Sequence, residues 1–292
     1  QEVNSFETGM GALAATWRPK TNLKMKFIAS AFHSFEQETF DVSGEYWLDQ
    51  LENNFGSDNL GEVKFNRGVG AYLHHARNYL SALVANAEHK GKLNLPKSNV
   101  WWGVKYQHEY VDDELNEWNL IDSAGYSVPQ APADEITLKY VYKAKNLLST
   151  NRYTGYLEQD WFFSDTSNFS LNYGVRFNYW DLNNQFLVSP RATVSYQPDW
   201  KKRNFLFRLS SGYYYQPPFY RELRNLYGQL NYDIKAQKSI HFVFGTDYNF
   251  TAWKRPFKLV AEVYYKHMDD IIPYEIDNVR IRYYANNNAR GY

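Results

Sequence analysis

The chain of 292 residues carries 32 acidic and 32 basic side chains and no cysteine. A net charge of zero argues against a nucleic-acid-binding protein, and a sequence without cysteine excludes disulfides, a thiolate nucleophile and a cysteine-ligated metal. No apolar run approaches the ~18–20 residues of a spanning helix, so a helical membrane protein is excluded. A membrane β-barrel is not excluded, because its strands turn only half of their residues towards lipid.

The first part of the chain alternates between strands and polar loops. A weak strand over Gly9–Arg18 precedes a clearer one over Leu23–Ala31, in which apolar residues alternate with lysine and serine. Phe40–Gly61 is rich in Asn, Asp and Glu and is predicted to be a long loop. Tyr79–Ala87 also fits a helical stripe, but we assign it to a strand because a short turn follows. A further strand is predicted over Val100–Glu109.

The second part holds the clearest strands, above all Phe169–Tyr179, where aromatic and aliphatic residues alternate with Ser, Asn and Arg. Long loops are predicted at Asp112–Thr150 and Pro217–Lys235, whereas Thr251–Pro256 is a short turn. The other predicted strands are Arg152–Phe163, Val188–Tyr196, Phe205–Gln216, Ser239–Phe250, Phe257–Met268 and a final one at Val279–Tyr284. Long strands with alternately short and long connections are typical of a transmembrane β-barrel.

Two features favour a membrane barrel over a soluble β-sandwich, which shows the same alternation. The predicted strands reach the ~9–11 residues that cross a bilayer at a tilt, whereas soluble strands cluster near ~5–6 residues. The tryptophans also lie in or beside connectors, as in the two aromatic girdles of a barrel. Trp17, Trp101, Trp102, Trp161, Trp200 and Trp253 lie near short turns, and Trp47, Trp118 and Trp180 lie near the opposite ends. We therefore predict an all-β protein, a partial transmembrane antiparallel β-barrel of about eleven strands.

The faces opposite to the apolar ones carry charges of both signs. They hold Lys105, Glu109, Glu158, Asp160, Arg176, Arg191, Arg208, Asp247, Lys258 and Glu262. Mixed signs give no single-sign pore field. They suit a wet lumen or an inserted plug that supplies counter-charges.

From Ser189 onward the sequence resembles the barrel of TonB-dependent outer-membrane receptors. The resemblance is carried by Ser189-Pro190-Arg191-Ala192, by Tyr214–Leu223 (YYQPPFYREL), and by Leu230-Asn231, Lys235, Ser239 and Gly245. The turn Tyr196-Gln197-Pro198 and the texture rich in Tyr and Asn resemble receptors of the Bacteroidetes. The chain departs from the family at Tyr232 and Ala236, where proline is frequent, and at Val243, where an acidic residue is usual.

This resemblance implies a barrel of about 22 strands around a plug, with a short N-terminal box that engages TonB. Neither plug nor box is recognisable in the sequence, so we expect residues 1–292 to be part of one receptor barrel domain. The implied function is TonB-dependent import of a nutrient ligand across the bacterial outer membrane. The implied partners are outer-membrane lipid and lipopolysaccharide, TonB acting through a plug, and a surface lipoprotein. A passive porin-like channel and a soluble glycan-binding β-sandwich are the alternatives, and the scaffold does not identify the ligand.

No residue pattern predicts catalysis, a cofactor or a metal. His74 and His75 are adjacent, so on a strand they point to opposite faces and cannot chelate one ion. Asp112-Asp113-Glu114 and Asp269-Asp270 lie at predicted loop starts, where solvated acids are commoner than a calcium site. Gly68-Val69-Gly70 lacks the rest of a dinucleotide fingerprint and predicts a bend or bulge.

Candidates for ligand capture are aromatic and arginine side chains on the long-loop side, because ring faces and guanidinium forks bind sugars, peptides and chelates. They are Tyr214, Tyr220, Arg221 and Arg224, together with Trp118 and Trp180. In the competing interpretation the tyrosines form the outer girdle and the arginines face anionic lipopolysaccharide.

Overall fold

The computed structural model describes residues 2–122, 124, 138–163, 168–200, 204–277 and 280–292. Its strands form an eleven-stranded sheet in the order β1 to β10 followed by β13, and a separate two-stranded sheet of β11 and β12. The large sheet is open, because β1 and β13 stand at its two ends. This confirms the predicted all-β fold with an unclosed, antiparallel sheet of about eleven strands.

The strands of the large sheet are β1 Glu2–Lys20, β2 Leu23–Leu51, β3 Val63–Leu95, β4 Ser98–Ile121, β5 Tyr140–Phe162, β6 Phe169–Trp180, β7 Gln185–Tyr196, β8 Asn204–Gln216, β9 Gln237–Ala252, β10 Arg255–Ile271 and β13 Ala289–Gly291. The small sheet pairs β11 Tyr274–Asp277 with β12 Arg280–Tyr283, and α1 Tyr220–Leu223 is a single helical turn. No helix among the described residues has the length and apolar character needed to cross a bilayer.

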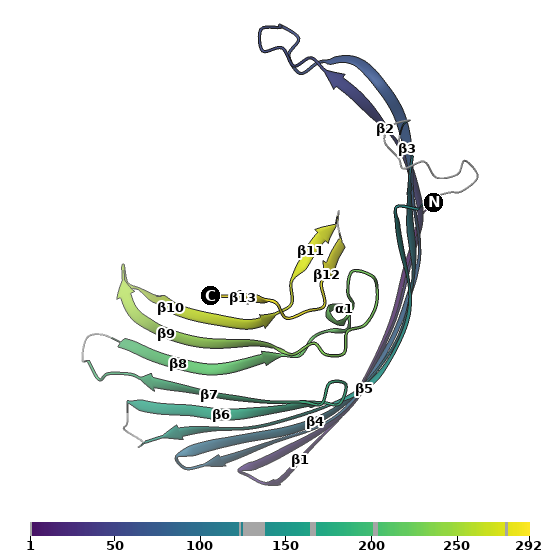
Figure 1. Cartoon of the computed structure of the whole chain (residues 1–292). Coiled ribbons are helices and arrows are strands. Elements are labelled where there is room, and N and C mark those ends of the chain that lie inside the picture. Colours follow the sequence, from purple (N-terminus) through teal and green to yellow (C-terminus); the bar gives the residue numbers. More distant parts are fainter. Residues whose placement is uncertain (1, 123, 125–137, 164–167, 201–203, 278–279) are drawn as a thin grey trace. The chain divides into compact units, whose positions relative to one another are not determined.

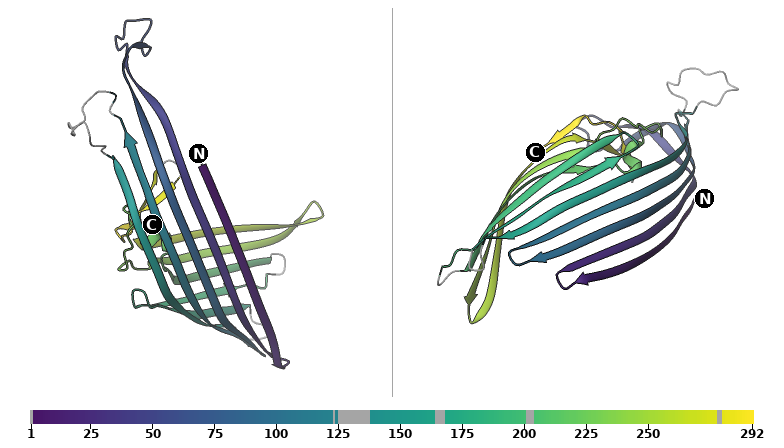
Figure 2. Two further views of the ribbon diagram at one scale, coloured as in Figure 1. Left: turned by 90° about the vertical axis from the view of Figure 1, so that its right-hand side faces the viewer. Right: turned by 90° about the horizontal axis from the view of Figure 1, so that it is seen from below.

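The chain divides into two compact units. The first comprises Gln1–Gly9, His33–Ala82 and Val111–Leu147, and the second comprises Met10–Phe32, Leu83–Tyr110 and Leu148–Tyr292. In the second unit, β6 to β10 lie side by side in chain order (Figures 1 and 2). Each of these strands pairs antiparallel with the next.

The outward face of these strands is apolar and uncovered. Antiparallel register places Leu209 opposite Phe244, and Phe244 opposite Val263. Phe244 is 49% exposed and Val263 is 74% exposed, so no second layer of described residues packs over them. A soluble sandwich would bury this face against another sheet, whereas a membrane barrel turns it towards lipid.

The inward face of the same strands is polar and ion-paired. Arg208 Nη2 lies 2.8 Å from Asp247 Oδ1, and Lys258 Nζ lies 2.8 Å from Asp247 Oδ2. On neighbouring strands, Asn172 Nδ2 donates hydrogen bonds to Glu158 at 3.0 Å and to Asp160 at 2.6 Å. Asp247 therefore neutralises Arg208 and Lys258 across strands, and Glu158 and Asp160 accept hydrogen bonds from an amide.

Two predicted loops are shorter than expected. β2 continues to Leu51 instead of ending before the predicted loop Phe40–Gly61, and β4 and β5 extend into the predicted loop Asp112–Thr150. Polar cross-strand pairs hold the β2–β3 hairpin, for example Asn66 Nδ2 to Asp49 Oδ1 at 2.8 Å. Apolar and polar residues alternate in a strand only where one of its faces is apolar. A strand with polar residues on both faces therefore resembles a loop in the sequence. Residues 125–137 of the second predicted loop lie outside the described residues.

The predicted final strand Val279–Tyr284 is a strand in its described part but does not belong to the large sheet. Its described part is β12, which pairs with β11 in the small sheet, while Val279 lies outside the described residues. The eleventh strand of the large sheet is β13, which pairs with β10 through Met268 opposite Gly291. A three-residue strand is too short to show periodicity, which explains why the sequence did not reveal it.

Candidate functional site

The connection between β8 and β9, residues 217–236 and called here the β8–β9 loop, is a packed element. Leu223, Ile234 and Ala236 are 0–1% exposed and form its small core. The side-chain oxygen of Asn225 accepts hydrogen bonds from the backbone N–H of Tyr227 (2.9 Å) and Gln229 (3.0 Å), which fixes a turn. The loop is therefore held in one conformation by its own sequence.

Side-chain amides attach the β8–β9 loop to neighbouring segments. Asn183 Nδ2 donates to the carbonyl of Ile234 at 2.9 Å, and Gln185 Oε1 accepts from the N–H of Ala236 at 2.9 Å. Asn287 accepts from the N–H of Lys235 at 2.8 Å and donates back to its carbonyl at 3.1 Å. These bonds satisfy backbone groups that a buried loop would otherwise leave unpaired.

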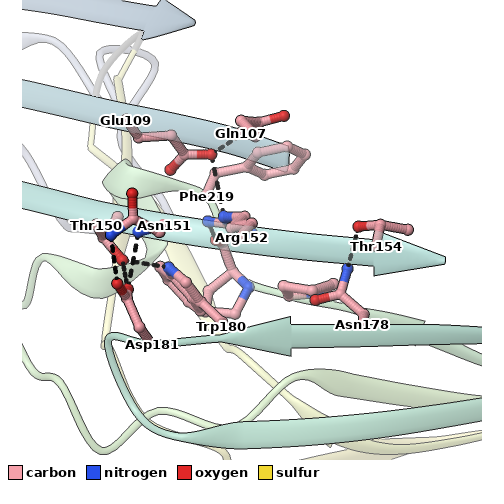
Figure 3. A network of polar contacts seen from close by, with 12 residues as sticks. Gln107, Glu109, Thr150, Asn151, Arg152, Thr154, Asn178, Trp180, Asp181 and Phe219 are labelled. Carbon is pink, nitrogen blue, oxygen red and sulfur yellow. Dashed lines mark hydrogen bonds and ion pairs between the residues drawn. The ribbon is translucent and has the colours of Figure 1, made fainter. Parts of the chain in front are cut away.

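Arg152 on β5 joins this loop to the inner wall (Figure 3). Its Nη2 donates to the carbonyl of Pro218 at 3.0 Å, and its guanidinium lies 3.8 Å from the centre of the Trp180 ring. Its Nε lies 3.0 Å from Glu109 Oε1, with both side chains about 85% buried. The Nε–H is not aligned for a hydrogen bond to that oxygen, so the contact is an ion pair. Glu109 also accepts a hydrogen bond from Gln107 on the same strand.

Asp181, directly after β6, closes the other side of this network (Figure 3). Its carboxylate accepts hydrogen bonds from the Thr150 hydroxyl, from the backbone N–H of Asn151 at 2.8 Å and from Asn151 Nδ2 at 2.7 Å. Burial acts to raise the pKa of Asp181, but these hydrogen bonds outweigh it and lower the pKa below its ordinary value. The carboxylate therefore stays ionised at neutral pH and fixes the middle of β5, at Thr150 and Asn151, relative to the β6–β7 turn.

The structure separates the six ligand-binding candidates. Trp180 is only 2% exposed, and its Nε1 donates to Thr150 Oγ1 at 2.7 Å, so its ring packs behind the β8–β9 loop and not in a lipid-facing girdle. Trp118 belongs to the first unit, where its ring stacks on His75 with centroids 4.7 Å apart. Tyr214 lies on the inward face of β8 and stacks on His241 with centroids 4.4 Å apart.

The other three candidates share one short segment. Tyr220 and Arg221 belong to α1, and Arg224 follows it, with its N–H bonded to the carbonyl of Arg221 at 3.4 Å. Arg221 is exposed, whereas Tyr220 and Arg224 are half-buried. Phe219, beside them, is 64% exposed. The segment thus presents cationic and aromatic side chains from a rigid base.

Sequence reasoning missed Arg152 and Asp181 as the groups that hold this base. The available signal was parity: Trp180 shares its face of β6 with Arg176 and Asn178, which places its ring inward. Arg152 likewise shares its face of β5 with Glu158. Parity alone does not predict that Arg152 and Trp180 meet. That prediction also needs the strand register, which places Arg152 opposite Trp180.

The remaining predicted features are structural. Asp113 lies within β4 and is 2% exposed, so the acids Asp112–Glu114 are not at a loop start as predicted. Among the described residues, no group of three or more His, Asp or Glu side chains is placed to hold a metal ion. Gly70 lies inside β3, and a Cβ there would be 2.3 Å from the Tyr46 ring, so this glycine makes room for a ring where a bend was predicted.

A hollow of about 910 Å³ lies on the second unit. Its walls are outward-facing side chains, including Leu13, Phe27, Val104, Tyr153 and Phe177. In a membrane barrel an outward apolar face meets lipid, so this hollow is not a candidate site for a water-soluble ligand.

Comparison with known proteins gives one family. The family model described as TonB dependent receptor-like, beta-barrel matches residues 6–292. No curated protein sequence matches the chain. Similar solved structures include the copper transporter OprC, with 14% identity, a TM-score of 0.49, and coverage of 97% of this chain and 48% of that chain. The ferric enterobactin receptor PfeA of Pseudomonas aeruginosa has 12% identity, a TM-score of 0.47, and coverage of 98% and 48%.

The RagAB peptide importer in its open-open state has 11% identity and a TM-score of 0.52, with coverage of 93% of this chain and 31% of that chain. A likeness at this identity supports the fold alone. The chain spans about half or less of the length of these solved structures.

Proposed function

Since this chain belongs to the family of TonB-dependent receptor-like β-barrels, we propose that the full protein imports a nutrient ligand through a plugged barrel. Ligand binds at the extracellular side, and TonB acts on the plug to open the lumen. The chain itself is part of an outer-membrane receptor or transporter barrel, a family of transport proteins rather than enzymes. The observation that carries the proposal is the open sheet with a bare apolar outer face and an ion-paired inner face.

We assign ligand capture to Tyr214, Tyr220, Arg221, Arg224 and Trp118. Trp180 contributes indirectly, because it packs on Arg152, which holds the β8–β9 loop. The loop core keeps the Tyr220–Arg224 segment in place, so its side chains meet the ligand without a large ordering cost.

The other parts of the proposal concern the whole receptor. Residues 1–292 form part of one barrel domain, and the plug and the TonB-binding box lie elsewhere in the receptor. A surface lipoprotein is a further partner, implied by the resemblance that the sequence shows from Ser189 onward. The bare apolar face supports contact with lipid and lipopolysaccharide, and the texture rich in Tyr and Asn supports a receptor of the Bacteroidetes type.

Conductance of the full-length receptor in planar bilayers tests this function. A plugged importer is closed at rest and conducts after its plug is removed, whereas a passive porin conducts in both forms. A soluble glycan-binding sandwich would remain in buffer instead of partitioning into detergent. Loss of uptake in a strain without TonB, with the receptor still in the outer membrane, supports energised import; unchanged uptake contradicts it.

A further inference from the structure

A row of basic residues crosses the inner wall from β7 to β10. Strand register places Arg191 opposite Gly212, Gly212 opposite His241, and His241 opposite Lys266. Residues directly opposite in an antiparallel sheet share one face. Neighbouring strands are ~4.8 Å apart, so the row spans about 14 Å. Its three side chains are half-buried.

Gly212 has no side chain, and the space beside it is filled by Tyr214, the next residue on the same face of β8. A Cβ at Gly212 would lie 2.8 Å from Arg191 Cβ, so this position accepts no side chain without displacing its neighbour. The ring of Tyr214 stacks on His241, tilted by 27°, and the Arg191 guanidinium lies 5.9 Å from the centre of the same ring. The row therefore has an aromatic surface with a cation on each side.

This row differs in charge from the rest of the inner wall. Nearer the β9–β10 turn, Asp247 neutralises both Arg208 and Lys258. Within the described part of the chain, no carboxylate lies at ion-pair distance from Arg191 or Lys266. Half-buried cations without a counter-charge are unfavourable, and a bound anion would relieve this.

We propose that Arg191, Tyr214, His241 and Lys266 form a binding site for an anionic solute with a planar ring. A guanidinium fork binds a carboxylate in two parallel hydrogen bonds, and the ammonium of Lys266, from the other end of the row, adds a second point charge. The ring of the solute packs against Tyr214, which is 39% exposed. The proposal rests on the proposed function and narrows it, because it defines the imported solute as an anion.

Titration calorimetry of the full-length receptor in detergent tests the site, with benzene-1,3,5-tricarboxylate as the probe. The neutral match is 1,3,5-tris(hydroxymethyl)benzene, and propane-1,2,3-tricarboxylate is the anion without a ring. We expect the aromatic anion to bind, with affinity falling as salt is raised, and the neutral compound not to bind. The double variant Arg191→Gln/Lys266→Gln weakens binding by about tenfold or more.

Two further variants separate a binding role from a structural one. Lys258→Gln removes the same charge from the same face of β10 and leaves binding within about twofold. Tyr214→Leu keeps both cations; it weakens binding of the aromatic anion and leaves that of propane-1,2,3-tricarboxylate unchanged. The proposal is overturned if the wild-type receptor does not bind the aromatic anion, if the neutral compound binds equally well, or if Lys258→Gln has the larger effect. Binding is measured without TonB, so a failed import assay leaves this result standing, and an importer that does not bind the probe refutes the site alone.

Discussion

Arginine substituted at Leu259 or at Val260 tests directly which face of β10 meets lipid. The two neighbours point to opposite faces yet are similarly exposed, at 59% and 51%. Leu259 is four to six residues from the turn that contains Trp253. At ~3.3 Å per residue and a strand tilt of ~45°, this separation places Leu259 about 10–14 Å into the bilayer, near the middle of the ~25 Å apolar band. Arginine at the midplane costs about 2–4 kcal/mol. Val260 faces inward, opposite Asp247, so arginine there is expected to change stability by about 1 kcal/mol or less.

Urea unfolding of the full-length receptor from lipid vesicles measures both costs. The apolar-outward arrangement requires Leu259→Arg to lower the free energy of unfolding by at least about 2 kcal/mol more than Val260→Arg does. Leu259→Gln serves as a control for loss of the side chain without adding charge. An equal loss of unfolding free energy at the two positions would refute the reasoning, because it would mean that both faces of the strand are exposed to water.

Three further variants test the packing described above. Arg152→Gln breaks a mostly buried ion pair and removes the hydrogen bond that holds the β8–β9 loop. Amide hydrogen exchange of that loop should become faster by an amount equivalent to about 2–4 kcal/mol. Arg176→Gln, which breaks no ion pair among the described residues, should leave the exchange rate of the loop unchanged. The pKa of Asp181 is lowered from 3.8, so its stabilisation is complete above that value and is lost as pH falls through the lower folded pKa. The melting temperatures of wild type and Asp181→Asn should therefore converge only below about pH 4. Gly70→Ala places a methyl group 2.3 Å from the Tyr46 ring and should cost about 1–3 kcal/mol in thermal unfolding.

Strand identity could be read from the sequence wherever one face of the sheet is apolar. β6, β9 and β10 were predicted to within a few residues because aromatic and aliphatic side chains recur there with period two. β2 was predicted to end about twenty residues too early, because beyond Ala31 both of its faces carry polar side chains. Those polar residues pair across strands, for example Asp49 with Asn66 at 2.8 Å, and such pairing leaves no periodic signature in one strand alone.

The candidate site could be predicted by residue type but not by contact. Tyr220, Arg221 and Arg224 were found because a long loop rich in aromatic and basic residues is a plausible place for ligand capture, and the structure keeps them on one segment. Trp180 was placed in a girdle because it ends a strand, whereas its parity turns it inward onto Arg152. Strand register decides between these outcomes, and register depends on partners that no single strand specifies.

The inner wall has one region in which cations are ion-paired and another in which they are not, and β10 contains a lysine of each kind. Lys258 and Lys266 lie on the same face of the strand, eight residues apart. Lys258 has Asp247 at 2.8 Å, whereas no described carboxylate lies at ion-pair distance from Lys266, whose opposite residue is His241. This difference in pairing leaves Lys266, and not Lys258, available to an anion that enters the barrel. A wall that receives an anion needs such a difference, since cations already neutralised by the protein bind a second anion weakly. The unneutralised row therefore marks the height on the wall where a counter-charge from outside the chain is expected.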